Sequence, residues 1–324
     1  MVMTSSIGRG VVLRVTIVSV LCWFGAAQDR ASFCNSFLKC IGSSLLCPVL
    51  FGYYNCSDFN IQRTAEPACG ASSVTGNASR YVMPRVLNGV DAEEREFPWT
   101  VNIVDDDAAI SMCGASIIRK DVILTAAHCV SSVVRSPSSL TVGYGSTKRS
   151  NLVYVRARRI IIHPAYNSRN GDNDIAVVIL NEALPLSAKT NLRSICLPKA
   201  GTSYDSNRRC IIVGWGIQKE TDNSFPDVLQ KAAVPLVPLN TCQRSYATNP
   251  YILVSERHLC AGYLGTGGID DCTGDSGGPL MCPEGDKWVL YGVVSRGNGC
   301  GRAQSPGVYT YVPQYVGWIL SQIP

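Results

Sequence analysis

Three residue types that can together form a hydrolytic centre occur far apart in the chain: His128, Asp174 and Ser276. A serine hydroxyl is a weak nucleophile unless a base lies within hydrogen-bond reach, and the base needs an acceptor that orients it. Histidine suits the role of base because its pKa lies near neutrality. Each residue alone also has a structural explanation, and only the local sequences decide between the two.

Those local sequences favour catalysis. His128 ends the run VILTAAH, directly after an apolar strand and beside a cysteine. Asp174 stands where the buried strand DIAVVIL begins, and a carboxylate there is unfavourable unless it is paired. Ser276 lies in a glycine-rich turn, which can expose the hydroxyl and direct backbone N–H groups at a substrate. Together the three settings predict nucleophilic catalysis by a serine.

The segments that must position these residues are short and rich in β-formers. A helical spacing appears only near the end, where Pro313 precedes Val316, Ile319 and Leu320. Many strands and one terminal helix predict an all-β barrel or sandwich for residues 86–324. The expected strands are contained in ASII, VILTAA, YVRARRIII, DIAVVIL, CIIVGWG, KWVLYGVVS and GVYTYV.

Composition excludes some classes of function. The chain has 324 residues, of which 46% are hydrophobic and 16% charged, as in ordinary globular proteins. Its net charge of +5 is mild, whereas a nucleic-acid binder has denser, clustered basic residues, so no nucleic-acid partner is expected. One basic cluster fits a solvated strand face, and an exosite for an acidic partner is the alternative. Its members are Lys148, Arg149, Arg156, Arg158 and Arg159.

The first 27 residues have the features of a secretory signal peptide. Arg9 and Arg14 precede the nearly unbroken apolar run 15–26, and residues 25–27 are small. A membrane anchor is the alternative, but the run of 12 residues is shorter than the ~20 needed to span a bilayer. We therefore expect a secreted, extracellular protein without a membrane partner.

Cysteine usage agrees with secretion. The chain has 15 cysteines, and cleavage near Ala27 removes Cys22 and leaves an even number. The expectation is then seven disulfides. Zinc is the competing explanation, but no Cys-x-x-Cys pair is followed by a pair of histidines, and the chain has only three histidines. We expect no metal site.

Residues 28–69 form a small cysteine-rich pro-region with Cys34, Cys40, Cys47 and Cys56, too short for a large core, so disulfides must supply much of its stability. Residues 70–85 are small and polar and predict an exposed linker. Asn55 and Asn77 begin Asn-x-Ser sequons, which are expected glycosylation sites.

The motifs TAAHC, DNDIA, CIIVGWG, GDSGGP and SPGVYTYV together resemble the trypsin-like (chymotrypsin-family) serine proteases, over about residues 86–324. The resemblance implies two antiparallel six-stranded β-barrels with the site between them. It implies that Ser276 attacks the scissile carbonyl, that His128 takes and returns the proton, and that Asp174 fixes the imidazole tautomer, which are the known triad roles of this family. The N–H groups of Gly274 and Ser276 would hold the oxyanion.

The resemblance also assigns an activation device. In this family, cleavage after an arginine such as Arg85 frees a new N-terminus, here Val86. The α-ammonium of Val86 would pair with Asp275, directly before the catalytic serine. A buried carboxylate without a cation is unfavourable, so cleavage would act as the switch.

Substrate recognition follows from the same resemblance. Asp270, six residues before Ser276, takes the place of the floor of the primary specificity pocket and would select Arg or Lys. Ser295 lies on the expected substrate-binding strand, and Gly297 and Gly307 match pocket-wall positions where glycine leaves the pocket open.

Three departures from the family pattern bear on specificity. Asp271 stands where a small neutral or hydroxyl residue is usual; it either deepens the negative field, raises its neighbour's pKa or turns to solvent. Arg296 replaces the usual aromatic between Ser295 and Gly297, which makes acidic or polar substrate residues plausible. The loop 145–154 has no acidic residue, so no calcium is expected there.

Matching each cysteine to the family pattern implies five disulfides, the last of which would keep the pro-region attached after cleavage. The four cysteines of residues 28–69 that remain would pair among themselves, in a segment similar to the clip modules of arthropod cascade proteases, which usually carry six. The implied pairs are Cys113–Cys129, Cys210–Cys282, Cys242–Cys260, Cys272–Cys300 and Cys69–Cys196.

The sequence thus predicts a secreted zymogen of a serine endopeptidase that cleaves after Arg or Lys by limited proteolysis in an extracellular cascade. Its expected partners are a protein or peptide substrate, an activating trypsin-like protease and a protein inhibitor, and no cofactor is expected. The alternatives are a catalytically weak or silent homologue that acts as a binding protein, and a membrane-anchored protease.

Overall fold

The structure is a computed structural model of the chain. It describes residues 46–49, 52–55, 68–72, 74, 89–106, 112–187, 189–190, 192–203, 205–206, 208–268 and 270–323. The expected signal peptide, the linker sequon Asn77 and the activation residues Arg85 and Val86 lie outside these residues.

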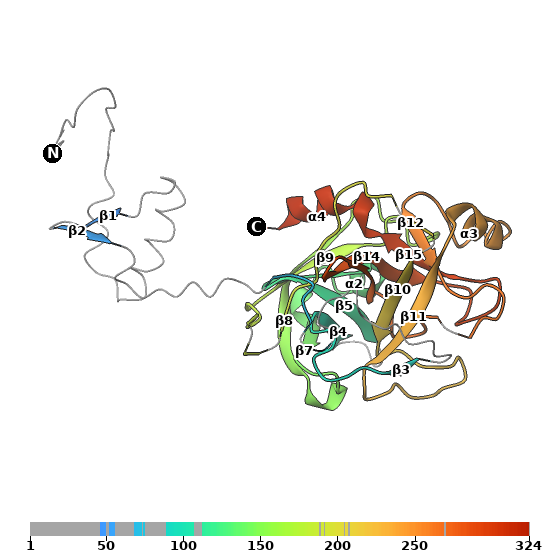
Figure 1. Cartoon of the computed structure of the whole chain (residues 1–324), viewed down its shortest axis with the longest axis horizontal. Helices are drawn as coiled ribbons and strands as arrows, with labels where there is room; N and C mark the ends of the chain where they lie inside the picture. The colour runs from blue at the N-terminus through green and yellow to red at the C-terminus, as the bar shows by residue number, and fades with distance from the viewer. Residues whose placement is uncertain are drawn as a thin grey trace, which may run out of the picture. The chain divides into compact units, whose positions relative to one another are not determined.

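The chain divides into two compact units, Met1–Thr64 and Ala65–Pro324 (Figure 1). In the first unit the described residues form an antiparallel hairpin of β1 (Leu46–Val49) and β2 (Gly52–Asn55). The pairing expected among Cys34, Cys40, Cys47 and Cys56 lies outside what the structure describes. The second unit contains every candidate site residue from Asp270 to Gly307 together with His128 and Asp174.

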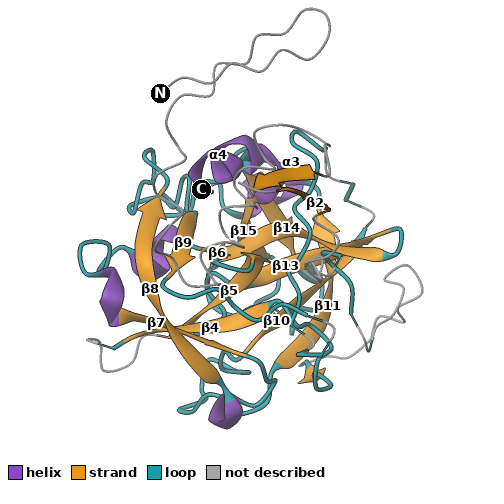
Figure 2. Ribbon diagram, turned by 90° about the vertical axis from the view of Figure 1, so that its left-hand side faces the viewer, coloured by secondary structure: helices purple, strands orange, loops and turns teal. Residues whose placement is uncertain are grey.

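Six antiparallel strands of the second unit close into a first barrel in the order β4-β5-β6-β9-β8-β7 (Figure 2). Its sequence explains the closure, because apolar strands of four to ten residues alternate with turns and leave no strand edge unpaired. The strands are β4 (Thr100–Asp105), β5 (Met112–Arg119), β6 (Val122–Thr125), β7 (Leu140–Tyr144), β8 (Val153–Ile162) and β9 (Ala176–Leu180).

A second barrel follows in the order β10-β13-β14-β15-β12-β11, and pairing of β10 with β11 closes it. The short strand β3 (Val90–Asp91) adds to the outer edge of β11, with Val90 opposite Lys231. The fold prediction of two six-stranded antiparallel barrels is confirmed. The strands are β10 (Arg209–Gly214), β11 (Gln230–Val237), β12 (His258–Ala261), β13 (Pro279–Glu284), β14 (Lys287–Arg296) and β15 (Gly307–Tyr311).

Helices are few and short in the described part of the chain. The expected C-terminal helix is α4 (Val316–Gln322), preceded by the 3-10 turn η6 (Val312–Gln314). The helix α3 (Leu239–Ser245) was not among the predicted elements, because it has one buried residue, Cys242, and hence no apolar stripe. None of the described helices is long and apolar enough to cross a bilayer. The remaining ones are α2 (Ala127–Val130), η4 (Pro137–Ser139) and η5 (Arg149–Asn151).

A continuous hydrophobic core joins the two barrels. Trp99 of β4 is fully buried, and its Nε1 donates to Met281 Sδ of β13 at 3.3 Å. Phe97 packs edge-on against both Trp99 and Trp288 of β14. Side chains of both barrels pack together in this core, so the two barrels are held in a fixed arrangement. The loops that face one another across their junction are therefore held in place as well.

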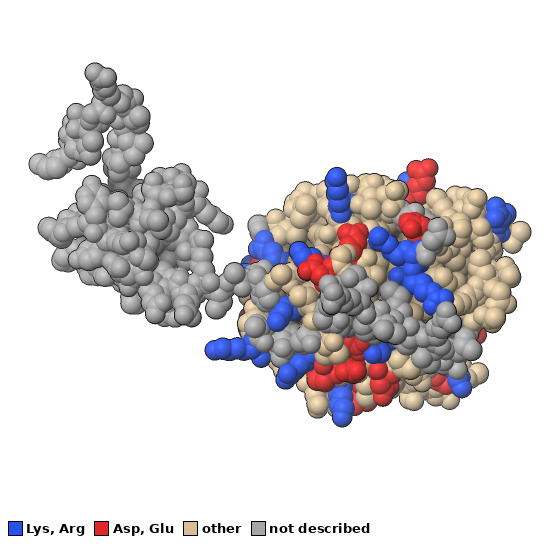
Figure 3. Space-filling model, in the orientation of Figure 1, with Lys and Arg blue, Asp and Glu red and all other residues tan. Residues whose placement is uncertain are grey.

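Basic and acidic side chains are interspersed on the surface of this unit (Figure 3). Within the basic cluster, Arg156 lies 3.7 Å from Asp106 and donates to Ser138 O. Arg149 binds the carbonyl oxygen of Pro226 at 2.9 Å. These contacts favour a solvated strand face, since part of the cluster is already engaged by the protein's own groups.

Candidate active site

The buried carboxylate of Asp174 holds the imidazole of His128. His128 Nδ1 lies 2.7 Å from Asp174 Oδ2, and the backbone N–H of His128 donates to Oδ1 at 2.9 Å. His128 belongs to α2, in the loop after β6, and Asp174 precedes β9, which pairs with β6. The neighbouring strands therefore bring the two residues together although 46 positions separate them.

Asn173 shapes the turn that carries Asp174. Its φ of 55° is in the left-handed region, which asparagine tolerates better than most residues. Its side chain donates to Ala165 O at 3.0 Å and accepts from the Tyr315 hydroxyl at 3.1 Å. The turn is thus fixed on both sides of the chain.

Asp174 has no exposed side-chain surface and is fully hydrogen bonded. The Ser295 hydroxyl donates to Oδ2 at 2.6 Å, and the Thr310 hydroxyl donates to the backbone oxygen at 2.7 Å. Burial raises the pKa of Asp174, but hydrogen bonds from His128 and Ser295 and the charge of His128 outweigh it, so the pKa lies below its ordinary value. An ionised Asp174 accepts from Nδ1–H and leaves Nε2 of His128 free to take a proton.

Ser276 lies in the turn between β12 and β13, beside the loop that carries His128. Its backbone oxygen accepts from Gly114 N–H at 2.7 Å. A Cβ on the next residue, Gly277, would lie 3.1 Å from the nitrogen of Ala126, two residues before His128. The φ of Gly277 is +79°, so this close approach needs glycine.

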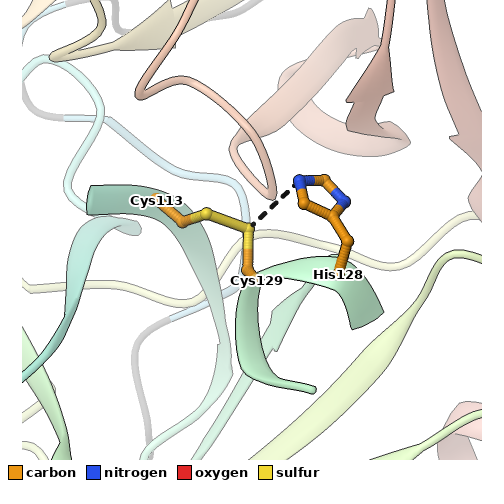
Figure 4. Close-up of side chains that lie close together, drawn as sticks. All are labelled: Cys113, His128 and Cys129. Carbon is orange, nitrogen blue, oxygen red and sulfur yellow. Dashed lines mark hydrogen bonds between the residues drawn. A yellow bond between two sulfur atoms is a disulfide. The ribbon is translucent and has the colours of Figure 1, made fainter. Parts of the chain in front are cut away.

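The structure brings the Ser276 turn against the segment that leads into His128, without a hydrogen bond between Ser276 Oγ and His128 in the described residues. Nε2 of His128 lies 3.6 Å from Cys129 Sγ instead (Figure 4). In enzymes without substrate such contacts are often long and tighten only when substrate binds.

Cys113, His128 and Cys129 form the cluster of metal-ligand types that the structure places together. Figure 4 shows Cys113 and Cys129 joined in a disulfide, with the imidazole beside it. Both sulfurs are therefore engaged covalently and do not act as thiolate ligands. The bond joins β5 to α2 and braces the histidine loop.

The backbone N–H groups of the Ser276 turn fall into two sets within the described part of the chain. The neighbouring N–H groups of Asp275, Gly277 and Gly278 donate to Cys272 O, Val294 O and Asp275 O. In contrast, the N–H groups of Gly274 and Ser276 donate to no group among the described residues. Gly274 is buried and has a φ of +100°. A pair of unsatisfied N–H groups beside a hydroxyl is the arrangement that an oxyanion needs.

The carboxylates of Asp270 and Asp271 converge on Gly307. A Cβ on Gly307 would lie 2.6 Å from Oδ1 of each, so any other residue there would fill the space. The Tyr309 hydroxyl donates to Asp271 Oδ1, and Gly301 N–H donates to Asp270 Oδ2 at 3.3 Å. Among the alternatives left open for Asp271, the structure therefore excludes the one in which it turns to solvent.

Burial raises the pKa of both Asp270 and Asp271, and the charge of Asp271 raises that of Asp270 further. Two carboxylates this close retain a proton unless a cation joins them. Gly297, the other expected wall residue, is exposed at the end of β14, and its Cβ position is 3.3 Å from Gly299 O. The Cys272–Cys300 disulfide joins the two segments that contain these residues.

Asp275 points away from Ser276, toward β10 and the residues after it. Its Oδ1 accepts from Gly216 N–H at 2.7 Å and its Oδ2 from Cys272 N–H at 3.0 Å. A Cβ on Gly214 would lie 1.9 Å from Oδ1, so the carboxylate fits only against glycine. Burial raises the pKa of Asp275 to about 7, because no cation among the described residues neutralises it.

A cavity of about 70 Å³ connects these acidic residues. Its lining includes Asp270, Asp271, Asp275 and Gly216, and also Gly89, the first residue of the described segment 89–106. A volume of this size has room for water or a small polar group beside the carboxylates.

The structure contains the five disulfides that the resemblance implies. Cys69–Cys196 ties residues 68–72 to the barrels of the second unit, where Gly70 N–H donates to Ser194 O at 2.8 Å and Trp288 N–H donates to Gly70 O at 3.0 Å. The others are Cys113–Cys129, Cys210–Cys282, Cys242–Cys260 and Cys272–Cys300.

Sequence reasoning missed Tyr309 and Thr310. Gly307 was expected in the pocket wall, and side chains two residues apart in a strand share a face, so the strand GVYTY contained a signal for Tyr309. Thr310, the next residue, lies on the other face of the strand and pairs with His258 of β12. Asp174 is 136 positions away in sequence, so no local pattern predicts the hydrogen bond from Thr310 to its backbone oxygen.

Comparison with known proteins agrees with this geometry. The sequence model of the family named Trypsin matches residues 86–319. Transmembrane protease serine 7 of Mus musculus is 38% identical over 250 residues, which cover 76% of this chain and 29% of that protein. Transmembrane protease serine 9 of Rattus norvegicus is 38% identical over 271 residues, 82% of this chain and 24% of that protein. The chain spans less than a third of the length of these curated relatives.

Proposed function

The chain belongs to the trypsin family of serine proteases, and from this premise we propose that it is the zymogen of an extracellular serine endopeptidase that cleaves after Arg or Lys. The observation that carries the proposal is the His128–Asp174 pair, 2.7 Å apart, beside the serine turn in which the N–H groups of Gly274 and Ser276 have no acceptor among the described residues. A binding protein would have no need for a buried, ionised aspartate that orients an imidazole.

In the proposed reaction, Ser276 Oγ attacks the scissile carbonyl carbon while its proton passes to Nε2 of His128. Asp174, which is already bonded to Nδ1, stabilises the imidazolium that forms. The N–H groups of Gly274 and Ser276 stabilise the oxyanion, and loss of one such donor typically raises the barrier by about 3–4 kcal/mol. The imidazolium then protonates the leaving amine, and water releases the acyl group by the same steps in reverse order.

Specificity for a basic residue is supported by the convergence of Asp270 and Asp271. A guanidinium or ammonium group that enters this pocket would release the shared proton and pair with the carboxylates, whereas a neutral side chain would leave them unpaired. Ser295, Gly297 and Gly307 would line the path of that side chain.

Activation by cleavage after Arg85 is supported by the position of Gly89. Gly89 and Asp275 line the same cavity, and Val86 is three residues before Gly89. Three extended residues span about 10 Å, so a new N-terminus at Val86 can bring its α-ammonium to Asp275. The docked strand β3 would anchor the segment from Val90 onward.

The Cys69–Cys196 disulfide supports a tethered pro-region, because Cys69 precedes Arg85 in sequence and Cys196 follows it. Such a tether fits limited proteolysis in an extracellular cascade better than bulk digestion. Partners would be a protein substrate, an activating trypsin-like protease and a protein inhibitor.

Secretion rests on the expected signal peptide of residues 1–27. The names of the relatives, transmembrane proteases, favour membrane anchorage as the second candidate. N-terminal sequencing of protein recovered from medium and from membranes distinguishes them: a start near Gln28 in the medium supports secretion.

The proposed activity is tested by cleaving the chain after Arg85 and profiling it on a peptide library, with Ser276→Ala as the matched control. We expect cleavage after Arg and Lys that the control lacks. Binding of peptides without turnover by the native protein would favour the alternative of a silent, extracellular binding protein.

A further inference from the structure

Arg296 lies directly beside the catalytic pair. It is the last residue of β14 and follows Ser295, whose hydroxyl donates to Asp174 Oδ2 at 2.6 Å. The pairing of β14 with β15 shifts register at this point, between Val294 and Arg296. Strand β14 therefore departs from regular pairing at Arg296, next to the His128–Asp174 pair.

The Arg296 guanidinium packs over Gly171, three residues before Asp174. A Cβ on Gly171 would lie 1.9 Å from Cζ and 2.0 Å from Nε, so the side chain takes this position only because residue 171 is glycine. Gly171 also has a φ of +77°, which disfavours other residues. Both features place the charge at one spot next to the triad.

Hydrogen bonds hold the segments around the Arg296 side chain in place. Leu253 N–H donates to Asn170 O at 3.2 Å, which joins the segment after α3 to the loop that contains Gly171. Arg296 Nη1 donates to the carbonyl oxygen of Tyr251 in the same segment, at 3.0 Å. One of the guanidinium's nitrogens is thus anchored, and the group is ordered without a charged partner.

The charge of Arg296 is unpaired within the described residues. The nearby carboxylate of Asp172 is taken by Arg257, which contacts it at 2.8 and 2.6 Å. Arg296 Nε is buried and has no hydrogen-bond partner. A cation that its own protein does not neutralise, in a site that binds peptides, is suited to an anionic partner.

Tyr166 lies near both charges. Burial raises the pKa of Tyr166 to about 12, the charge of Asp174 raises it as well, and the charge of Arg296 opposes this. These effects agree with the position of Arg296 over Gly171, three residues before Asp174.

We propose that Arg296 is a specificity-determining residue that binds a Glu or Asp side chain of the substrate, located two to four residues before the scissile bond. This inference rests on the proposed peptidase function. Ser295 lies on the expected substrate-binding strand, so the substrate residues that precede the scissile bond would run along Ser295 and Arg296, at about 3.3 Å for each extended residue. The planar guanidinium fork matches a carboxylate in two parallel hydrogen bonds.

The test compares peptides that have Arg before the scissile bond and either Glu or Gln at the second, third or fourth residue before it. For the protein cleaved after Arg85, we expect kcat/KM to favour Glu by about 1.5-fold to fivefold at one of these positions, the range for an exposed ion pair. The preference should fall as salt rises.

Three variants identify the source of the preference. In Arg296→Gln the Glu-to-Gln ratio should fall to about 1, because the chain keeps its length and a donor but loses its charge. Arg296→Lys should retain part of the ratio, since it keeps the charge without the fork. Arg158→Gln, which removes an exposed positive charge on β8, should leave the ratio unchanged.

Equal kcat/KM for the Glu and Gln peptides at all three positions overturns the inference, as does a ratio that survives in Arg296→Gln. If no peptide is cleaved, the proposed function fails. The inference about Arg296 is then tested separately, by measuring the affinities of the same peptides for the Ser276→Ala protein. Tighter binding of the Glu peptide that depends on Arg296 supports it, and equal affinities refute it.

Discussion

Replacing Asp275 by asparagine in the uncleaved chain is expected to stabilise the protein, by an amount that grows with pH. Burial raises the pKa of Asp275 to about 7, against an ordinary value of 3.8. A raised pKa in the folded state means that the stability contributed by the protonated form is fully present below pH 3.8 and is lost as the pH rises to about 7. An asparagine cannot ionise and avoids this loss.

The magnitude follows from the two pKa values. At about 1.4 kcal/mol for each pKa unit, the difference corresponds to about 4 kcal/mol above pH 7 and to about 1.6 kcal/mol at pH 5. Asp275 retains some accessible surface, and solvent screening halves these values approximately. We therefore expect the advantage of Asp275→Asn to be about 1–3 kcal/mol larger at pH 8 than at pH 5.

The assay is urea unfolding with disulfides intact, at pH 5 and pH 8, in a Ser276→Ala background that prevents self-cleavage. Asp286→Asn, the same substitution in an exposed turn, is the control and should show no such pH dependence. An advantage that does not change with pH would show that the carboxylate of the uncleaved chain is not buried without a cation.

Cleavage after Arg85 should reverse the sign of this effect. The parent protein then gains an ammonium partner for Asp275, whereas Asp275→Asn gains none. If cleavage leaves the advantage of the variant unchanged at pH 8, the Val86 amine does not reach Asp275.

Three further predictions concern specificity, the tether and pH. Asp270→Ser should weaken cleavage after Arg and Lys more than Asp271→Ser does, in kcat/KM for matched peptides; the reverse order would assign the pocket floor to Asp271. After cleavage, the Cys69–Cys196 bond should give one band on a non-reducing gel and two on a reducing gel, and separation without reductant would refute the tether. Pairing with Asp275 would raise the pKa of the Val86 amine above its reference of about 7.7–8.0, so activity should decline as pH rises through the raised value. Val86→Gly should move this alkaline limb to lower pH and leave the acid limb unchanged in a pH–activity profile; an unmoved alkaline limb would refute control by insertion.

Much of the fold could be predicted because its strands are local sequence features. The run DIAVVIL contains strand β9, and the run KWVLYGVVS covers strand β14 except for its last residue, Arg296. The helix α3 could not be predicted, because a seven-residue helix with one buried residue has no periodicity to detect.

The site residues that belong to short sequence motifs could be predicted. Contacts between residues far apart in the sequence could not. Asp271 and Arg296 stood out as unusual residues, but their sequence neighbours do not determine where their side chains point. Tyr309, 38 positions away, turns Asp271 inward, and Gly171 makes room for Arg296 across 125 positions. Such contacts depend on packing between β-strands, which the order of residues in one segment does not reveal.

The central claim, that Ser276 is a nucleophile activated by His128 and oriented by Asp174, is tested most directly by covalent labelling with a fluorophosphonate that reacts with activated serines. The chain cleaved after Arg85 should take up one label per molecule, located on Ser276 by peptide mapping, and Asp174→Asn should slow the labelling greatly. Label on another residue, or equally fast labelling in Asp174→Asn, would contradict the mechanism.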